Sequence, residues 1–393
     1  MDWERIAADT PGAAGQVFLD SAGSSLPPMP VLDAVTGHLR REAEIGGYRA
    51  AEERADDLAR VKVSLGALLG APPHAVALTD SATRAWTQVF YAIALQPGEK
   101  ILLSGVEYAS NAVAALQRAR ASGAVVEVVP SDPAGQIDLD ALAGLLDERV
   151  RIVSLVHVPT NGGLVNPVRE VVQLAHAQGA FVLLDSCQAV GQLRIDVTEL
   201  GVDALSGTGR KWLRGPRGTG FLYVRPDLIS ALEPPVIDLH SAEWRSRHSY
   251  ALREDASRFE LWECDVAAQL GLGAAVDYLL ALGIDEVEQA VGARAERLRA
   301  ALAEIPQVSV RDLGPTRCGI VSFTIDGVEP AAVRDALADH HITVTVSRSS
   351  STLLDMQARG LSAVVRASPH YFVRPDQLDG AITAIAALAT GRR

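Results

Sequence analysis

The sequence predicts an α/β protein with a large, mostly parallel β-sheet domain and a smaller α+β domain at the C-terminal end. Between residues 75 and 224, short β-branched and apolar runs alternate with segments of helical periodicity, which is typical of a parallel sheet covered by helices on both faces. Most of these runs are apolar without alternation, as expected for strands buried on both sides. After Pro234 and Pro235 the pattern changes to a polar stretch and then to a long helical region.

The elements of the large domain follow one another along the chain. Strands are predicted at 75–78, 100–104, 125–129, 151–156, 180–184, 204–205 and 220–224. Helices are predicted at 110–122, 139–146 and 168–178, and Gly179 ends the last of these just before the next strand.

The second region begins with the polar stretch 240–258 and the helical region 266–305. It continues with strands at 308–310, 320–325, 342–346 and 363–367 and with helices at 330–338 and 375–388. We therefore expect an N-terminal segment (1–30), a large domain (31–260), and a linking helix with a small C-terminal domain (261–393).

Composition excludes several classes of protein. The chain has 393 residues, of which 48% are hydrophobic and 21% charged, as in ordinary globular domains. Its 36 basic and 48 acidic residues give a net charge of −12 without a basic block, so nucleic acid is not expected as a partner. No secretory signal and no apolar run of about 18 residues is present, so we expect a cytoplasmic protein without membrane association. The three cysteines, Cys187, Cys264 and Cys318, have neither disulfide-framework nor metal-ligand spacing, so no metal is expected.

Two residues that follow predicted strands suggest a chemistry. Asp185 ends an apolar strand where ligands of α/β sheets bind, although by itself it is equally consistent with a helix cap. Lys211 lies in a glycine-rich stretch and is followed by Trp212 and Leu213, which favours desolvation and a lowered pKa, as Schiff-base lysines require. An aspartate and a lysine in these places match the needs of pyridoxal phosphate, whose aldehyde binds an amine and whose ring nitrogen needs an acidic partner.

Six segments in the same order resemble class V aminotransferases, the cysteine desulfurase-like branch of fold-type I pyridoxal phosphate enzymes. They are 17–27, 78–83, 107–111, 157–167, 185–188 with 202–211, and 366–371, and they extend over nearly the whole chain. The resemblance implies the fold-type I architecture, with the cofactor on the large domain, pyridoxal 5′-phosphate as cofactor, and a homodimer with the site at the subunit boundary.

The resemblance also assigns roles around the cofactor ring. It implies that Lys211 is the Schiff-base lysine, Asp185 the partner of the pyridinium nitrogen and Gln188 the donor to the ring hydroxyl. Tyr108 falls where the family places an aromatic ring over the cofactor, although alone it would be read as a core residue. Thr160 stands where relatives often carry asparagine beside the ring oxygen.

A second group is expected at the cofactor phosphate. Ala82 and Thr83 open a helix after a strand, so their backbone N–H groups and the Thr83 hydroxyl suit an anion. By resemblance, Thr208 and Arg210 match the serine and histidine that precede the family lysine.

Substrate contacts are expected from other segments. Arg366 matches the family arginine that binds the substrate carboxylate, a role that suits its fork geometry, the alternative being a surface salt bridge. Tyr48, and Ser24 in the opening segment, are further candidate substrate contacts.

The chain departs from the desulfurase pattern in two places. The segment 346–355 contains no cysteine where desulfurases carry a mobile nucleophile, and Cys187 is expected to be a packed thiol. Its polar run from Ser347 to Thr352 is equally consistent with a substrate-contacting loop and with an exposed turn. Glu263 replaces a threonine that relatives use to reach the partner subunit's phosphate, and a carboxylate cannot donate there unless protonated.

These departures resemble the branch that holds C–S lyases and isopenicillin N epimerase-like proteins. We expect a C–S β-lyase that cleaves a cysteine S-conjugate to a thiol, pyruvate and ammonia in sulfur or antibiotic biosynthesis. The alternatives are an aminotransferase, epimerase or decarboxylating deaminase acting on an amino acid, and a cofactor-binding relative without turnover.

Overall fold

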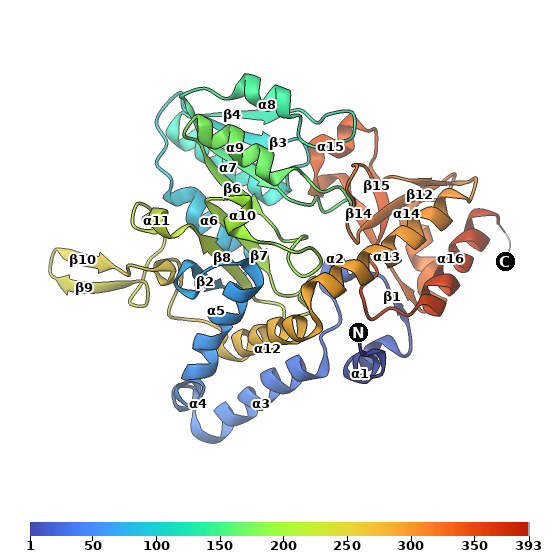
Figure 1. Cartoon of the computed structure of the whole chain (residues 1–393), viewed down its shortest axis with the longest axis horizontal. Coiled ribbons are helices and arrows are strands. Elements are labelled where there is room, and N and C mark those ends of the chain that lie inside the picture. The colour runs from blue at the N-terminus through green and yellow to red at the C-terminus, as the bar shows by residue number, and fades with distance from the viewer. Residues whose placement is uncertain (392–393) are drawn as a thin grey trace.

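A computed structural model describes residues 1–391, in which two β-sheets are joined by long helices (Figure 1). The large sheet has the strand order β2-β8-β7-β6-β5-β3-β4. Strands β3 to β7 run parallel, whereas β8 is antiparallel to both β7 and β2. Its strands are β2 (Val76–Thr79), β3 (Lys100–Ser104), β4 (Val125–Val129), β5 (Val150–Val156), β6 (Phe181–Asp185), β7 (Ala204–Thr208) and β8 (Gly220–Val224).

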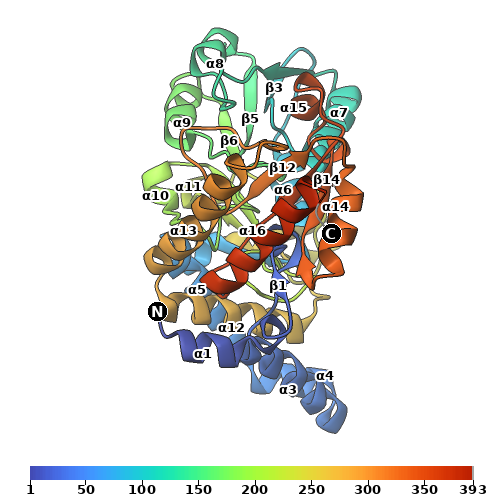
Figure 2. The same ribbon diagram turned by 90° about the vertical axis from the view of Figure 1, so that its right-hand side faces the viewer.

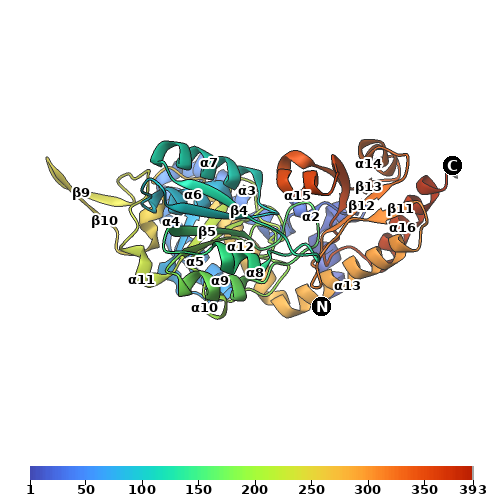
Figure 3. The same cartoon turned by 90° about the horizontal axis from the view of Figure 1, so that it is seen from above.

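Helices cover both faces of this sheet, with α6 and α7 on one side and α8 and α9 on the other (Figure 3). Alternate residues of one strand therefore enter different cores. Ile101 and Leu103 of β3 pack with α6 and α7, whereas Leu102 belongs to the core on the opposite face. The helices are α5 (Ala55–Leu69), α6 (Ala82–Ala92), α7 (Ala109–Ser122), α8 (Leu139–Leu145), α9 (Val168–Ala177), α10 (Val197–Leu200) and α11 (Pro226–Ile229).

The C-terminal part is built on a four-stranded antiparallel sheet with the order β11-β12-β15-β14. Helices α13 and α14 pack on this sheet, and α16 lies against both helices (Figure 2). The elements are α12 (Val266–Leu282), α13 (Ile284–Ala303), β11 (Val308–Val310), β12 (Val321–Ile325), α14 (Pro330–Ala338), β13 (Ile342–Thr343), β14 (Thr345–Arg348), α15 (Leu353–Ala358), β15 (Ala363–Ala367) and α16 (Pro375–Ala389).

The N-terminal segment connects the two parts. Strand β1 pairs in parallel with β13 of the C-terminal part, while α12 packs against both α3 and α5. The helical arm formed by α3 and α4 extends away from the body of the molecule (Figures 1 and 2). The elements are α1 (Trp3–Asp9), β1 (Val17–Phe18), α2 (Ser21–Ser24), α3 (Met29–Ile45) and α4 (Gly47–Glu53).

Three predicted regions differ in detail from the structure. The helical region 266–305 consists of two helices, α12 and α13, that bend by 84° around Gly283, whose φ of 85° suits glycine. The predicted strand 342–346 divides between β13 and β14, which pair with different partners. The polar stretch 240–258 contains the hairpin of β9 (Ala242–Ser246) and β10 (Ser249–Leu252), which projects from the body (Figure 3).

No single helix within residues 1–391 has the length and apolar content needed to cross a membrane, and the pair α12 and α13 that reaches this length is sharply bent. The same residues contain no group of three or more His, Cys, Asp or Glu side chains arranged to hold a metal ion.

Candidate active site

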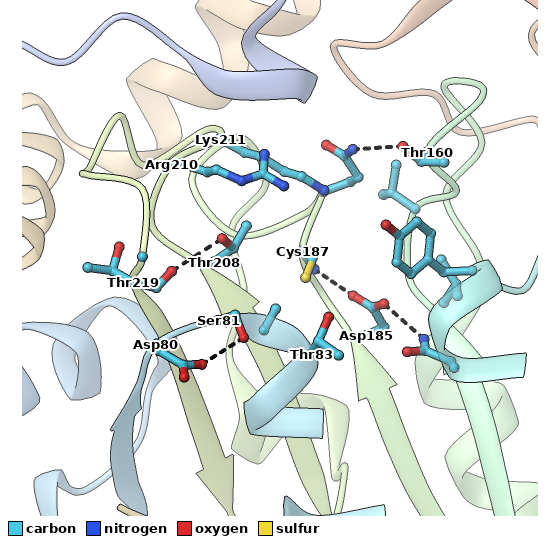
Figure 4. Close-up of a pocket in the computed structure, with 17 residues that line it drawn as sticks. Asp80, Ser81, Thr83, Thr160, Asp185, Cys187, Thr208, Arg210, Lys211 and Thr219 are labelled. Carbon is cyan, nitrogen blue, oxygen red and sulfur yellow. Dashed lines mark hydrogen bonds between the residues drawn. The ribbon is translucent and has the colours of Figure 1, made fainter. Parts of the chain in front are cut away.

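A pocket of about 120 Å³ lies at the carboxyl ends of β5, β6 and β7 (Figure 4). This is where parallel sheets bind their ligands. The pocket brings together nine of the residues expected from the sequence: Ala82, Thr83, Tyr108, Thr160, Asp185, Gln188, Thr208, Arg210 and Lys211.

Asp185, the last residue of β6, is buried and both of its carboxylate oxygens have donors. Oδ1 accepts the Cys187 backbone N–H at 3.0 Å, and Oδ2 accepts the Asn111 side-chain amide at 3.0 Å. Asn111 also donates to Glu107 at 2.9 Å. The carboxylate is therefore held in one orientation at the floor of the pocket (Figure 4).

Lys211 lies at the opposite side of the pocket, in the loop between β7 and β8. Burial lowers the pKa of its amine, and the neighbouring cations Arg210 and Arg366 act in the same direction. The chain contains three lysines; Lys62 and Lys100 form ion pairs with carboxylates, whereas Lys211 has none within 4 Å among the described residues. Its amine is therefore the one best suited to react with an aldehyde.

The turn that carries Lys211 is fixed from several directions. The indole of Trp212 is fully buried and donates to Gln188 Oε1 at 3.0 Å, while the Trp212 carbonyl accepts from His370 at 3.0 Å. Arg214 closes the turn with a backbone bond to the Lys211 carbonyl, in the left-handed conformation with φ of 63°. These contacts hold the lysine loop between β6 and the C-terminal part.

One end of the pocket is suited to an anion. Helix α6 begins at Ala82 after the N-cap Ser81, so the N–H groups of Ala82 and Thr83 lack helical acceptors. Thr208 and the Arg210 guanidinium line the same pocket, and Arg210 also donates to the carbonyl of Gly23. A Cβ at Gly220 would lie 2.4 Å from the Ser81 carbonyl carbon, so glycine there permits the close approach of β8 to this helix start.

At the other end, Thr160 joins two of the expected residues. Its hydroxyl oxygen accepts from Gln188 Nε2 at 3.3 Å and from Arg366 Nη1 at 3.0 Å. Gln188 Nε2 also donates to the Ala22 carbonyl, so both of its hydrogens are engaged. The two bonds to the Thr160 oxygen do not use the hydrogen of its hydroxyl, and Thr160 lines the pocket.

Arg366 lies behind Thr160, on β15, and does not line the pocket itself. Burial lowers the pKa of its guanidinium, and Asp20 pairs with its Nη2 at 3.1 Å. Its Nε is buried without a hydrogen-bond partner within the described part of the chain. An unpaired buried donor of this kind indicates a missing acceptor, such as a substrate carboxylate.

Besides Arg366, three residues singled out in the sequence do not line this pocket. Tyr48, on α4, is 83% exposed, and Ser24 ends α2 without lining the cavity. Glu263 lines a second, larger cleft that meets the pocket at Asp80 and Gly218. Tyr108 does line the pocket, at the N-cap of α7, with 37% of its surface exposed.

Sequence reasoning missed the residues that support the site. Asp20 lies within the opening segment 17–27, and Glu107 and Asn111 lie within 107–111, but no role was expected for any of them. Glu107 directly precedes Tyr108, the N-cap of α7, and Asn111 lies in the first turn of that helix; this spacing at a helix start was the signal available.

The comparisons with known proteins agree with this geometry. A family model described as aminotransferase class-V matches residues 17–380. The chain belongs to this family. The cysteine desulfurase of Dickeya dadantii is 31% identical over 96% of this chain and 94% of that protein. A probable cysteine desulfurase 2 of Mycobacterium leprae is also 31% identical, over 98% of this chain and 96% of its own length.

Solved structures resemble the whole molecule. The apo cysteine desulfurase of Thermococcus onnurineus has a TM-score of 0.91 at 25% identity, covering 99% of this chain and 98% of that one. A cystine C–S lyase, solved with its product cysteine persulfide, has a TM-score of 0.87 at 24% identity, covering 96% and 99%, and shows the shared fold. Membership of aminotransferase class V confirms the predicted fold-type I architecture and a pyridoxal phosphate-dependent enzyme.

The pocket of this class V member fits its cofactor. The α6 N-terminus and Arg210 offer positive potential to a phosphate, Asp185 offers a fixed carboxylate to a ring nitrogen, and Lys211 offers a desolvated amine to an aldehyde. Arg366, bonded to the pocket residue Thr160, has a buried Nε without a partner among the described residues, which suits a substrate carboxylate. The donor set therefore matches both the cofactor and an amino acid.

Proposed function

We propose that the protein is a C–S β-lyase that cleaves a cysteine S-conjugate and releases a thiol, pyruvate and ammonia. The observation that carries the proposal concerns the segment from Ser347 to Thr352. This segment contains no thiol, and hydrogen bonds to Asn161 hold both of its ends in place. Asn161 donates to Thr352 Oγ1 at 2.5 Å and accepts from the Ser347 hydroxyl. A segment that is held in place and carries hydroxyl groups but no thiol cannot bring a sulfur nucleophile to a substrate.

The other thiols are also unsuited to accept sulfur. Burial raises the pKa of Cys187 well above its usual range, and the adjacent Asp185 carboxylate acts in the same direction. Its thiol therefore stays protonated and weakly nucleophilic. Cys318 is buried and Cys264 lies in the second cleft. This supports loss of the leaving thiol to solvent rather than its transfer to the protein.

Different residues of the chain have different roles in the proposed reaction. Bound pyridoxal phosphate supplies an electron-accepting ring that stabilises negative charge at the substrate Cα. Arg366 holds the substrate carboxylate through its free Nε, and Lys211 removes the Cα proton because its lowered pKa leaves an unprotonated amine available. Asp185 orients the ring through its nitrogen, and Thr160 donates to the ring oxygen.

The test is a product assay with the purified holoenzyme and a panel of cysteine S-conjugates. We expect stoichiometric pyruvate, ammonia and thiol in the absence of any 2-oxo acid. An absolute requirement for a 2-oxo acid would identify an aminotransferase instead, and inverted or decarboxylated substrate would identify the epimerase or decarboxylating alternative. No turnover of any substrate would indicate a relative that binds the cofactor without catalysis.

A second candidate, a cysteine desulfurase, is favoured by the names of the curated relatives. The same assay with free cysteine separates the two. Formation of alanine together with protein-bound persulfide would support the desulfurase and contradict the lyase, whereas pyruvate and sulfide would support the lyase.

We further propose that the enzyme works as a homodimer. The second cleft adjoins the pocket and carries the half-exposed Trp262 beside Glu263, while Trp244 on the projecting β9–β10 hairpin is 82% exposed. Aromatic side chains of this kind are enriched at protein interfaces. Covering this face with a second copy would also give Tyr48 a site to contact. Light scattering that finds a stable, fully active monomer would contradict this.

The three free cysteines fit a reducing compartment such as the cytoplasm.

A further inference from the structure

A buried polar cluster lies next to Asp185, reaching the pocket through Asn111, and the proposed chemistry does not use it. It consists of Glu107 after β3, Asn111 on α7 and Ser154 on β5, whose exposed fractions are 4%, 3% and 0%. Asn111 donates to Glu107 Oε1 at 2.9 Å, and the Ser154 hydroxyl lies 2.9 Å from Glu107 Oε2.

The Asn111 amide is the connecting element of the cluster. Its nitrogen carries two hydrogens, and the two acceptors within bonding distance are Glu107 Oε1 and Asp185 Oδ2. The orientation of the amide is therefore set from both sides. Because Asp185 Oδ1 is held by the Cys187 N–H, the bond from Asn111 fixes the plane of the carboxylate that faces the pocket.

Glu107 is surrounded by neutral groups. Its partners are the Ser154 hydroxyl from β5, the Asn111 amide from α7 and its neighbour's backbone N–H, and the charged group acting on it within the described chain is Asp185 of β6. Burial raises the pKa of Glu107 to about 8, and the Asp185 charge acts in the same direction. A carboxyl with this pKa is mostly protonated at neutral pH, and the Ser154 hydroxyl, which donates to Oε2 when Glu107 is charged, can then accept its proton in a hydrogen bond.

We propose that Glu107 is a positioning residue for Asp185: its Oε1 accepts from the Asn111 amide and holds that amide in the orientation that fixes the Asp185 carboxylate. In its uncharged form Glu107 also leaves Asp185 as the single negative charge of the cluster. This inference rests on the proposed role of Asp185 as the partner of the cofactor's ring nitrogen. It is independent of which substrate is cleaved.

The test compares Glu107→Gln with Glu107→Ala in the holoenzyme. Glutamine reproduces the neutral acid, since its oxygen can accept from Asn111 and its amide can donate to Ser154. We expect it to keep the absorption spectrum of the bound cofactor and a dissociation constant within about 3-fold of wild type. Alanine removes the acceptor, and we expect kcat to fall about 10–100-fold at nearly constant KM, as for other residues that orient a functional group. Its cofactor should bind about 10-fold more weakly and show an altered spectrum.

The overturning results are equally specific. If Glu107→Gln is as impaired as Glu107→Ala, the charged form of Glu107 is the one that positions Asp185. If Glu107→Ala has the wild-type spectrum and kcat, the cluster contributes only to packing.

Leu102→Ala on β3 is the control, because it opens a cavity in the same sheet and should lower stability without altering the spectrum. Asp185→Asn distinguishes a failure of the proposed role of Asp185 from a failure of the proposed role of Glu107. If it leaves the spectrum unchanged, the proposed role of Asp185 fails; if it changes the spectrum while the Glu107 variants do not, this inference alone fails.

Discussion

Arg366 Nη2 and Asp20 Oδ1 lie 3.1 Å apart, although 346 residues separate them in the sequence. The pair joins the N-terminal segment, just after β1, to strand β15 at the edge of the pocket. Burial raises the pKa of Asp20 while the Arg366 charge opposes this, and burial lowers the pKa of Arg366. The buried ion pair therefore aims the guanidinium and leaves its Nε for another acceptor.

The first prediction follows from removing the anion of this pair. Asp20→Asn should lower the free energy of unfolding by about 2–3 kcal/mol, because it leaves the largely buried Arg366 without a counter-charge. It should also raise KM about 10-fold by loosening the guanidinium. Denaturant unfolding and steady-state kinetics measure the two effects. Asp379→Asn, which breaks the half-exposed pair with Arg297, is the matched control and should cost less than about 1 kcal/mol. Equal effects of the two variants would contradict the prediction.

The second prediction concerns the shape of the cation. Arg366→Lys keeps the charge but loses the Nε and the fork that reaches Thr160 and Asp20 together. We expect kcat/KM for an amino acid substrate to fall at least about 100-fold, because an ammonium cannot bond Thr160 and Asp20 and also present a third donor to the substrate carboxylate from the same position. Binding of pyridoxal phosphate alone should change little. Equal losses of substrate and cofactor binding would show that the substitution disturbs the whole pocket instead.

The sequence predicted the large sheet well because its strands are buried on both faces and carry continuous apolar runs, as in 100–104 and 220–224. It also singled out Asp185 and Lys211, which line one pocket, since a strand-end carboxylate and a lysine among glycines and apolar residues are local patterns. The ion pair of Asp20 with Arg366 and the amide of Asn111 could not be predicted. Their partners come from distant strands, and nothing in the neighbouring residues specifies which surfaces meet.

The third prediction uses the pH dependence of stability. Glu107 has a pKa of about 8 in the folded protein and 4.5 ordinarily, so between these values the folded form holds a proton that the unfolded chain lacks. Unfolding then releases a proton, and the free energy of unfolding falls as pH rises through this window, by about 1.4 kcal/mol per pH unit. Glu107→Gln lacks this contribution, so its stability relative to wild type should increase from pH 5 to pH 7.5. Urea titrations of cofactor-free protein measure the difference, and a difference independent of pH would contradict it.

The fourth prediction concerns Arg214, which is 1% exposed and donates to the Leu26 carbonyl, the Tyr371 hydroxyl and the Thr10 hydroxyl. Arg214→Ala should cost about 3 kcal/mol of stability, because these buried acceptors lose their donor. Arg214→Gly should cost about 0.5–1 kcal/mol less than alanine, since the φ of 63° at this position strains any residue with a Cβ. Thermal and urea unfolding of the two variants measure the order. If Arg214→Ala were more stable than Arg214→Gly, the backbone at this position would relax when the guanidinium is lost, which would contradict the prediction.

The last prediction concerns the choice among the three lysines. Lys62 lies 2.8 Å from Glu260, and Lys100 lies 3.3 Å from Glu127 and 3.2 Å from Asp147, so both amines are engaged in ion pairs with carboxylates. Burial lowers the pKa of Lys211, which leaves more of the free amine that attacks an aldehyde. Borohydride reduction of the holoenzyme should therefore place a pyridoxyl group on Lys211, with less than about 10% of the label on the other two lysines, as peptide mass spectrometry would measure. Lys211→Ala should lose the label and at least about 1,000-fold in kcat, while Lys62→Ala keeps both. Label on Lys62 or Lys100 in the wild type, or a labelled Lys211→Ala variant, would contradict the assignment, because the reactive amine would then be one that the structure engages in an ion pair.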